Sequence, residues 1–303
     1  MLQLLQVFYN VITPILLIAA LGFTLDHKFK LNTRSLSQII IYLASPALVL
    51  TSISRTTLIS QKLQQIVFFT AAVMGSMAVI GWGLASLLGL GKKLKSAFAL
   101  SVTLLNAGNF GIPFIVFAFG QDALGVAVIV YATTAIVANT LGIFLASSGS
   151  ASVKNSLTNI VKVPLPYAVA LGLLVNFGVF ALPAPVGRGL ELLGQAAVPL
   201  MLVVLGAQLA RVKIEKQLPL IALAGSMKVL FAPVLGYFLA RLMGFSGQTA
   251  SIAIIQTSMP TAVISMILAE EFGSEAKFVS GVVMFSTLLS FLSLSVLLTL
   301  LGG

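Results

Sequence analysis

The sequence predicts an all-α integral membrane protein whose ten transmembrane helices form two inverted five-helix repeats, with helices 4 and 9 broken. Composition, the spacing of the charges and a repeat of sequence landmarks predict this class. Of the 303 residues, 59% are hydrophobic and only 8% are charged, whereas soluble domains carry about 25% charged residues. The charges stand in small clusters separated by apolar stretches long enough to span a bilayer, which takes roughly 20 residues. This spacing leaves no room for a soluble domain.

Charged or Pro/Gly-rich connectors divide the chain into ten apolar segments. We expect spanning helices at approximately 4–25, 33–54, 64–90, 96–119, 122–147, 163–182, 189–210, 217–240, 248–270 and 276–301. The first segment starts without a basic region, so we interpret it as a retained span and not as a cleaved signal. The chain contains no cysteine, which excludes disulfides and thiolate chemistry.

The net charge of +10 reflects membrane topology and does not indicate nucleic-acid binding. Connectors after odd-numbered segments carry twelve Lys and Arg residues and those after even-numbered segments carry four; with Lys228, which lies inside a segment, these make up all 17. Basic connectors stay in the cytoplasm. We therefore expect both termini to face outward.

Sequence landmarks recur in the same order in the two halves. The tripeptide at 75–77 is repeated at 225–227, and three prolines of the first half have counterparts about 150 residues later. These pairs are Pro14 and Pro166, Pro46 and Pro199, and Pro113 and Pro260. The repeats would be residues 1–150 and 151–303. Because each holds five spans, the two halves have opposite orientations in the membrane.

Pro113 and Pro260 break the fourth and ninth segments. A proline inside a helix removes a backbone donor and clashes with the preceding turn, and the freed backbone groups cannot face lipid. Paired broken helices in inverted repeats are typical of secondary transporters, which bind substrate near the midplane. The alternative is structural: isolated proline kinks and interhelical Asn or Ser bonds are common in membrane helices.

The candidate site gathers the polar and small residues around the two breaks. The N-terminus of each second half-helix, at Pro113 and Pro260, carries a partial positive charge that suits a carboxylate. Amides and hydroxyls beside these termini would add hydrogen bonds. The candidate residues are Asn106, Asn109, Pro113, Thr257, Ser258 and Pro260 for substrate, with Gly108 and Gly111 at the break itself.

Lys228 is a charged residue deep inside the eighth segment. It lies 11 residues from Gln217 and 13 from Arg241, too far from either end for its side chain to reach the headgroups comfortably. Three readings remain open: carbonyl ends of the broken helices accept its hydrogen bonds, the substrate anion pairs with it, or it exchanges a proton during transport.

Coupling also stays open from the residues alone. His27 is the single histidine and falls in the first connector, where we expect it to be solvated. Coupling would then use Lys228, a sodium ion held by neutral oxygens such as those of Asn106, Asn109, Thr257 and Ser258, or no ion at all. The sequence shows no metal-ligand spacing and no nucleophile beside a base, so we expect neither an enzyme nor a cofactor.

Four stretches resemble the auxin efflux carrier family, which includes the plant PIN carriers and bacterial permeases for malate and malonate. These are "NAGNFGIP", "VPLMLVVLGAQL", "MKVLFAPVLGY" and "SMPTAVISMILAEEFG". The resemblance implies the fold of sodium/proton antiporters and bile-acid transporters, with Pro113 crossing over Pro260. Spans 1, 2, 6 and 7 would form a scaffold and a homodimer contact, and spans 3–5 and 8–10 a transport domain that moves as an elevator.

The resemblance also implies roles for individual residues. Asn106 matches an asparagine that contacts the substrate carboxylate in PIN carriers, and Lys228 matches an arginine. Leu165 stands where those carriers have a substrate asparagine, so auxin recognition is not implied. We expect an efflux carrier or facilitator in a bacterial inner membrane, for a small mono- or dicarboxylate or an auxin-like acid. The alternative is a sodium-coupled organic anion symporter of the bile-acid type.

Overall fold

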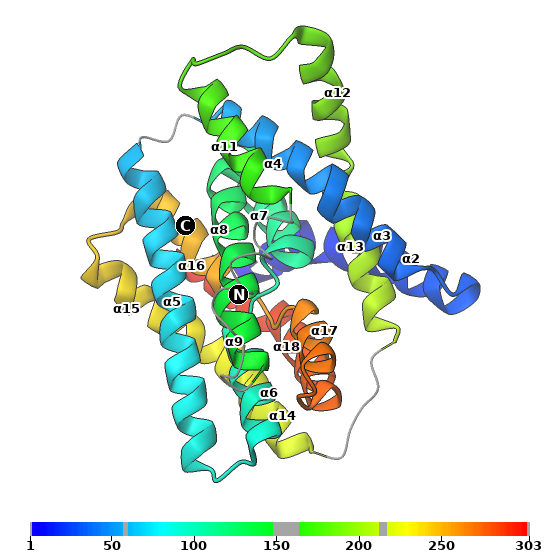
Figure 1. Cartoon of the computed structure of the whole chain (residues 1–303), viewed down its shortest axis with the longest axis vertical. Helices are drawn as coiled ribbons and strands as arrows, with labels where there is room; N and C mark the ends of the chain where they lie inside the picture. The colour runs from blue at the N-terminus through cyan, green and yellow to red at the C-terminus, as the bar shows by residue number, and fades with distance from the viewer. Residues whose placement is uncertain (1, 57–59, 148–163, 212–216, 302–303) are drawn as a thin grey trace.

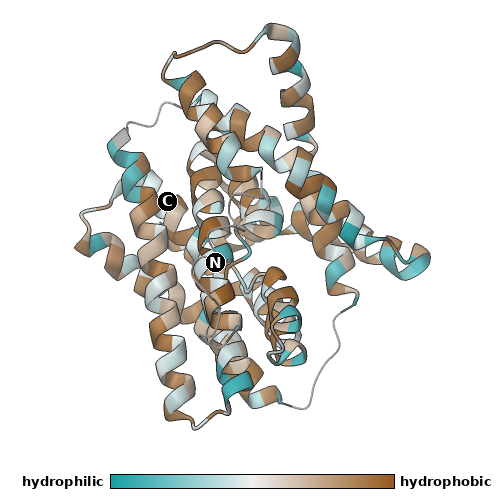
Figure 2. Cartoon of the chain, viewed as in Figure 1, coloured by the Kyte–Doolittle hydropathy of each residue, from teal (hydrophilic) through white to brown (hydrophobic). Residues whose placement is uncertain are grey.

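The computed structural model describes residues 2–56, 60–147, 164–211 and 217–301, and these residues form helices and no strand (Figure 1). Within them, seven helical stretches are long and apolar enough to cross a membrane. Hydrophobic residues run along most of their length, and hydrophilic ones gather near helix ends and connectors (Figure 2). The chain is therefore a multi-pass membrane protein, as the composition predicts.

Several of the seven stretches are assembled from consecutive helices, some with a π-turn between them. The first holds α1 (Leu2–Val7), η1 (Phe8–Ile12) and α2 (Thr13–Phe29), and the second holds α3 (Thr33–Ile39), η2 (Ile40–Ala44) and α4 (Ser45–Ser54). The third is α5 (Ser60–Leu87). The next holds η4 (Gln121–Ala123), α8 (Leu124–Val137), η5 (Ala138–Gly142) and α9 (Ile143–Ala146).

The second half of the chain supplies the other three long stretches. These are α12 (Ala184–Gln195) with α13 (Ala197–Leu209), then α14 (Leu218–Ser226) with η6 (Met227–Phe231) and α15 (Ala232–Leu242), and finally α18 (Ala276–Leu301).

The remaining three expected segments hold shorter helices. The fourth consists of α6 (Lys92–Thr103), η3 (Ala107–Gly111) and α7 (Ile112–Phe119), the sixth of α11 (Leu165–Asn176), and the ninth of α16 (Gly247–Thr257) and α17 (Ile264–Glu271). The helix is interrupted at residues 104–106 and again at 258–263. The predicted breaks in the fourth and ninth segments are thus confirmed, whereas ten spans in two inverted repeats remain a prediction.

The helices pack in two groups. In the first, α2 lies along α13, and α4 lies along α11 and α12; in the second, α5 packs against α6 and α8, α14 against α18, and α15 against α16. Figure 1 shows α2, α4 and α13 on one side and α5 and α15 on the other. The first group also contacts the second, since α13 packs against η3 and α7, and the division into scaffold and transport domain remains a prediction.

Glycines bring α2 and α13 into close contact. A methyl group added at Gly206 would lie 2.7 Å from the carbonyl carbon of Ala19 and 2.9 Å from the nitrogen of Phe23, which are both backbone atoms. Gly22 meets the backbone of Val203 just as closely. Small residues that let backbones approach are the usual means of helix association in membranes, so this pair is held tightly together.

Candidate functional site

The two interrupted segments lie against each other where neither is helical. The backbone N–H of Asn106 donates to the carbonyl oxygen of Pro260 at 2.8 Å, and the N–H of Ala262 donates to that of Leu104 at 3.1 Å. Leu105 and Thr261 thereby form an isolated antiparallel bridge. Backbone groups freed by the two breaks are paired with each other, as the interior of a membrane protein requires.

Side chains from neighbouring helices fix this pairing. The hydroxyl of Thr261 donates to the carbonyl oxygen of Ser101 in α6 at 2.8 Å, and its N–H donates to the hydroxyl oxygen of Ser286 in α18 at 3.1 Å. The side-chain amide of Gln256 donates to the carbonyl oxygens of Ala107 and Ala127 at 3.2 and 2.9 Å. The crossing is therefore a rigid feature that four helices hold in place.

One of the two prolines occupies a different place from that expected. Pro260 lies at the crossing, but Pro113 lies in the first turn of α7 and does not stand over it. Residues 104–106 take that position instead. The helix resumes at Ala107 with the π-helical turn η3 and contains Pro113, because π-type hydrogen bonds let a membrane helix accommodate a proline. The second half-helix of the fourth segment accordingly begins at Ala107, and that of the ninth at Ile264.

Gly111 completes the π-helical turn η3 beside the crossing. Its N–H donates to the carbonyl oxygen of Asn106 at 2.9 Å. A methyl group added there would lie 3.2 Å from that oxygen and from the Cγ of Gln256. Any larger side chain would push these groups apart, which explains the glycine.

A cavity of about 600 Å³ opens beside the crossing, between the two groups of helices. One wall comes from α3, η2, α4, α11 and α13, and the other from α5, the segment at 105–109, α8, η5 and α17. Of the predicted site residues, Asn106, Gly108 and Asn109 line it. Its polar lining consists of Ser37, Asn106, Asn109, Tyr131, Thr133, Thr134, Asn139 and Gln208, and its described lining residues include no Asp, Glu, Lys, Arg or His.

The amides are the groups in this lining that can bind a carboxylate. Among the described residues, the side chains of Asn106, Asn109 and Gln208 have no hydrogen-bond partner, whereas Asn139 donates to the carbonyl oxygen of Ala135 at 2.8 Å. Amide N–H groups donate to an anion, and such charge-assisted bonds are stronger than neutral ones. The cavity thus presents unpaired donors in a largely apolar, uncharged setting.

Tyr131, Asn139 and Gln208 are lining residues that the sequence did not reveal. Each is neutral and lies within a long apolar helix, so no charge or helix break marks it. One indirect signal exists for Tyr131: a methyl group added at Gly108 would lie 2.8 Å from its ring. The glycine predicted at the break is needed because this ring packs on the backbone there.

Thr257 and Ser258 are fully buried and stand outside the cavity lining. Their hydroxyls donate to carbonyl oxygens one turn earlier in α16, those of Ala253 and Ile254. Both side chains are engaged with their own helix in this conformation. Gly111, Pro113 and Pro260 also lie outside the lining, although Pro260 is part of the crossing itself.

Lys228 is fully buried in η6 and lies outside the cavity lining. Its ammonium nitrogen has no hydrogen-bond partner among the described residues. The reading in which carbonyl ends of the broken helices accept its hydrogen bonds is therefore wrong for this conformation. The π-turn η6 packs against α6 and α18, the helices that bind Thr261 at the crossing.

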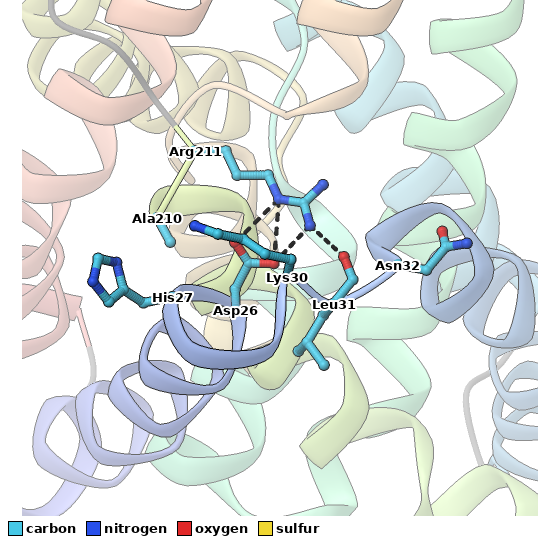
Figure 3. A pocket seen from close by; sticks show the side chains of 7 residues that line it. All are labelled: Asp26, His27, Lys30, Leu31, Asn32, Ala210 and Arg211. Atoms are coloured by element: carbon cyan, nitrogen blue, oxygen red, sulfur yellow. Dashed lines mark hydrogen bonds and ion pairs between the residues drawn. The ribbon is translucent and has the colours of Figure 1, made fainter.

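A second pocket, of about 740 Å³, lies where α2 and α13 end (Figure 3). Arg211 dominates it: its guanidinium donates to Asp26 at 2.6 to 3.2 Å, to the hydroxyl oxygen of Thr33 at 3.1 Å, and to the carbonyl oxygen of Leu31. The hydrogen bond to Asp26 raises the pKa of Arg211. His27 lies exposed at its edge, as expected.

The charged groups at the centre of this second pocket already satisfy one another. Figure 3 shows the Arg211 guanidinium between Asp26 and Leu31. Asp26 is nearly inaccessible, with 4% of its side chain exposed. This arrangement fastens the connector after α2 to the end of α13, and the cavity beside the crossing remains the candidate site.

Comparisons with known proteins agree with a transport role. A family model described as "Membrane transport protein" matches residues 7–163 and 150–298. An uncharacterized transporter of Methanothermobacter thermautotrophicus is 26% identical over 291 residues, which cover 93% of this chain and 95% of the relative. An uncharacterized transporter of Methanocaldococcus jannaschii is 24% identical, over 86% of this chain and 87% of its own.

Proposed function

We propose a function from one premise: the chain belongs to the membrane transport protein family, the auxin efflux carriers. The proposal is that it carries a small organic anion across the membrane, as an efflux carrier or facilitator. Its substrate would be a carboxylate bound in the cavity beside the crossing. Like other secondary carriers, it would bind this substrate where the broken helices meet.

The cavity is the observation that carries this proposal. At about 600 Å³ it has the size of sites for small organic ligands, and the side-chain amides of Asn106 and Asn109 line it without hydrogen-bond partners among the described residues. These amides would donate to the carboxylate, while the apolar lining would contact the body of the acid. No acidic side chain among the described lining residues would repel an anion.

The lining favours a single carboxylate over two. Each charge that leaves water for a low-dielectric site costs several kcal/mol unless it is compensated. The unpaired amides compensate one carboxylate, but the described lining offers no cation for a second. Among the acids considered, monocarboxylates would therefore bind better than malate or malonate.

The position of the cavity supports alternating access by an elevator movement. It lies between the helices expected to form the scaffold and those expected to form the transport domain. A shift of one group against the other would move the crossing, with bound substrate, past α11 and α13. Ten spans in two inverted repeats, a homodimer through scaffold helices, an inner-membrane location and outward-facing termini are parts of the same proposal.

Solid-supported-membrane electrophysiology on proteoliposomes tests the function. Indole-3-acetate, lactate, malate, malonate and taurocholate are applied with sodium or with choline, and protein-free liposomes serve as the control. The proposal expects substrate-evoked current that does not depend on sodium. Current that requires sodium would identify a sodium-coupled symporter instead, and the absence of both current and tracer flux for every acid would refute the proposal.

A further inference from the structure

We propose that Gln208 is a second substrate contact, which selects acids that carry an O–H or N–H donor remote from the carboxylate. The inference deepens the proposed function and rests on it. It concerns the part of the cavity wall that α13 forms, and it assigns a role to a residue that the helix breaks do not single out.

Gln208 lies near the end of α13 and lines the same cavity as Asn106 and Asn109. Close packing against α2 holds α13, the helix of Gln208, in place. Two residues earlier, Gly206 packs directly on the backbone of Ala19, closer than any side chain would allow. Gln208 is therefore presented to the cavity from a firmly held helix.

The amide of Gln208 has unused hydrogen-bonding capacity. Its side-chain oxygen is buried and receives no hydrogen bond from any described residue. Five other buried side-chain atoms of the described chain share this condition, and none of them belongs to a cavity-lining residue. Unpaired buried polar atoms are rare and costly in folded proteins. The unpaired oxygen of Gln208 at the cavity is therefore best explained by a ligand that donates a hydrogen bond to it.

The unpaired atom defines the chemistry of that ligand. A carbonyl oxygen accepts hydrogen bonds and cannot donate them, so the ligand must bring a hydroxyl or an N–H. The last torsion of a glutamine side chain is soft, which lets a ligand draw the oxygen to the cavity surface. With the carboxylate on Asn106 and Asn109, a donor elsewhere on the acid would reach Gln208, which lines the same cavity.

Three aromatic acids of similar shape test this assignment. In 4-hydroxyphenylacetate the ring carries a donor, in 4-methoxyphenylacetate the donor is methylated, and phenylacetate has neither group. Affinities are measured by calorimetry on purified protein for wild type, Gln208→Met, and Gln195→Met as a control at an exposed glutamine of α12. Gln208→Leu serves as a second variant if the methionine variant does not fold.

We expect wild type and Gln195→Met to bind the hydroxy acid about five- to tenfold more tightly than the other two, the usual gain from one hydrogen bond. In Gln208→Met the three affinities should become equal, with that for phenylacetate unchanged. The ligand-free variant should also unfold at the same or a higher temperature, because an unpaired polar group has been removed.

Two results would overturn the assignment. Equal affinities of wild type for all three acids would show that Gln208 does not select a donor, and a preference that persists in Gln208→Met would place the contact elsewhere. If wild type bound no organic acid at all, the proposed function would fail together with this inference. Binding without preference would refute the inference alone.

Discussion

Replacing Gly206 with alanine tests how firmly α13 is held against α2. The added methyl group would lie 2.7 Å from the carbonyl carbon of Ala19 and 2.9 Å from the nitrogen of Phe23, whereas ordinary contacts begin at 3.4 Å. The helices would have to separate by at least about 0.7 Å at this point, because both obstacles are backbone atoms that cannot rotate away. A gap of 0.5 to 1 Å loses about a quarter to a half of the dispersion attraction across it.

We expect this substitution to cost about 3 kcal/mol, at the upper end of the usual range for overpacking. The assay is thermal unfolding of detergent-purified protein followed by circular dichroism. Gly75→Ala is the matched control, because a methyl group there meets no atom within 4 Å in the middle of α5; it should leave stability unchanged or raise it by up to about 1 kcal/mol. Equal unfolding temperatures for the two variants would refute the close contact between α2 and α13.

Three further substitutions test the cavity, the crossing and the ion pair. Gly108→Ala places a methyl group 2.8 Å from the Tyr131 ring; displacement of the ring should weaken binding of bulky acids about tenfold more than that of small ones, and competition binding measures this. Thr261→Val removes a buried hydrogen bond of 2.8 Å at the crossing and should lower stability by about 1 kcal/mol, which an unchanged unfolding curve would contradict. Asp26→Asn removes the carboxylate that binds Arg211; faster hydrogen exchange over residues 26–33 is expected, and exchange identical to wild type would show that the pair does not order the connector.

The prolines pointed to the correct two segments, but only one of them lies in a break. Pro260 stands in the interruption at 258–263, where it excludes a helical hydrogen bond, whereas Pro113 stands inside the helix that follows the interruption at 104–106. The register of the crossing, that is, which residues pair across it, does not depend on local sequence alone. It follows from hydrogen bonds between distant segments, such as that of Asn106 with Pro260, and the position at the crossing that the family resemblance implied for Pro113 was incorrect.

The site was predicted in part for a similar reason. Asn106 and Asn109 stood out as amides beside a broken helix, and both line the cavity. Thr257 and Ser258 looked equally available, but hydroxyls in helices commonly bond to carbonyls one turn earlier, and here they do. Gln208 became visible only when tertiary packing brought α13 to face the crossing.

The central claim is that the cavity beside the crossing holds the carboxylate of the substrate on Asn106. Its direct test is the affinity of Asn106→Ala for the best-transported acid, measured beside its unfolding temperature. The backbone N–H and carbonyl of Asn106 bond to Pro260 and Gly111, whereas its side-chain amide has no hydrogen-bond partner in the described part of the chain, so the variant should fold normally. The account predicts a loss of affinity of roughly ten- to a hundredfold, the value of a hydrogen bond to a charged group. Normal folding with unchanged affinity would contradict it.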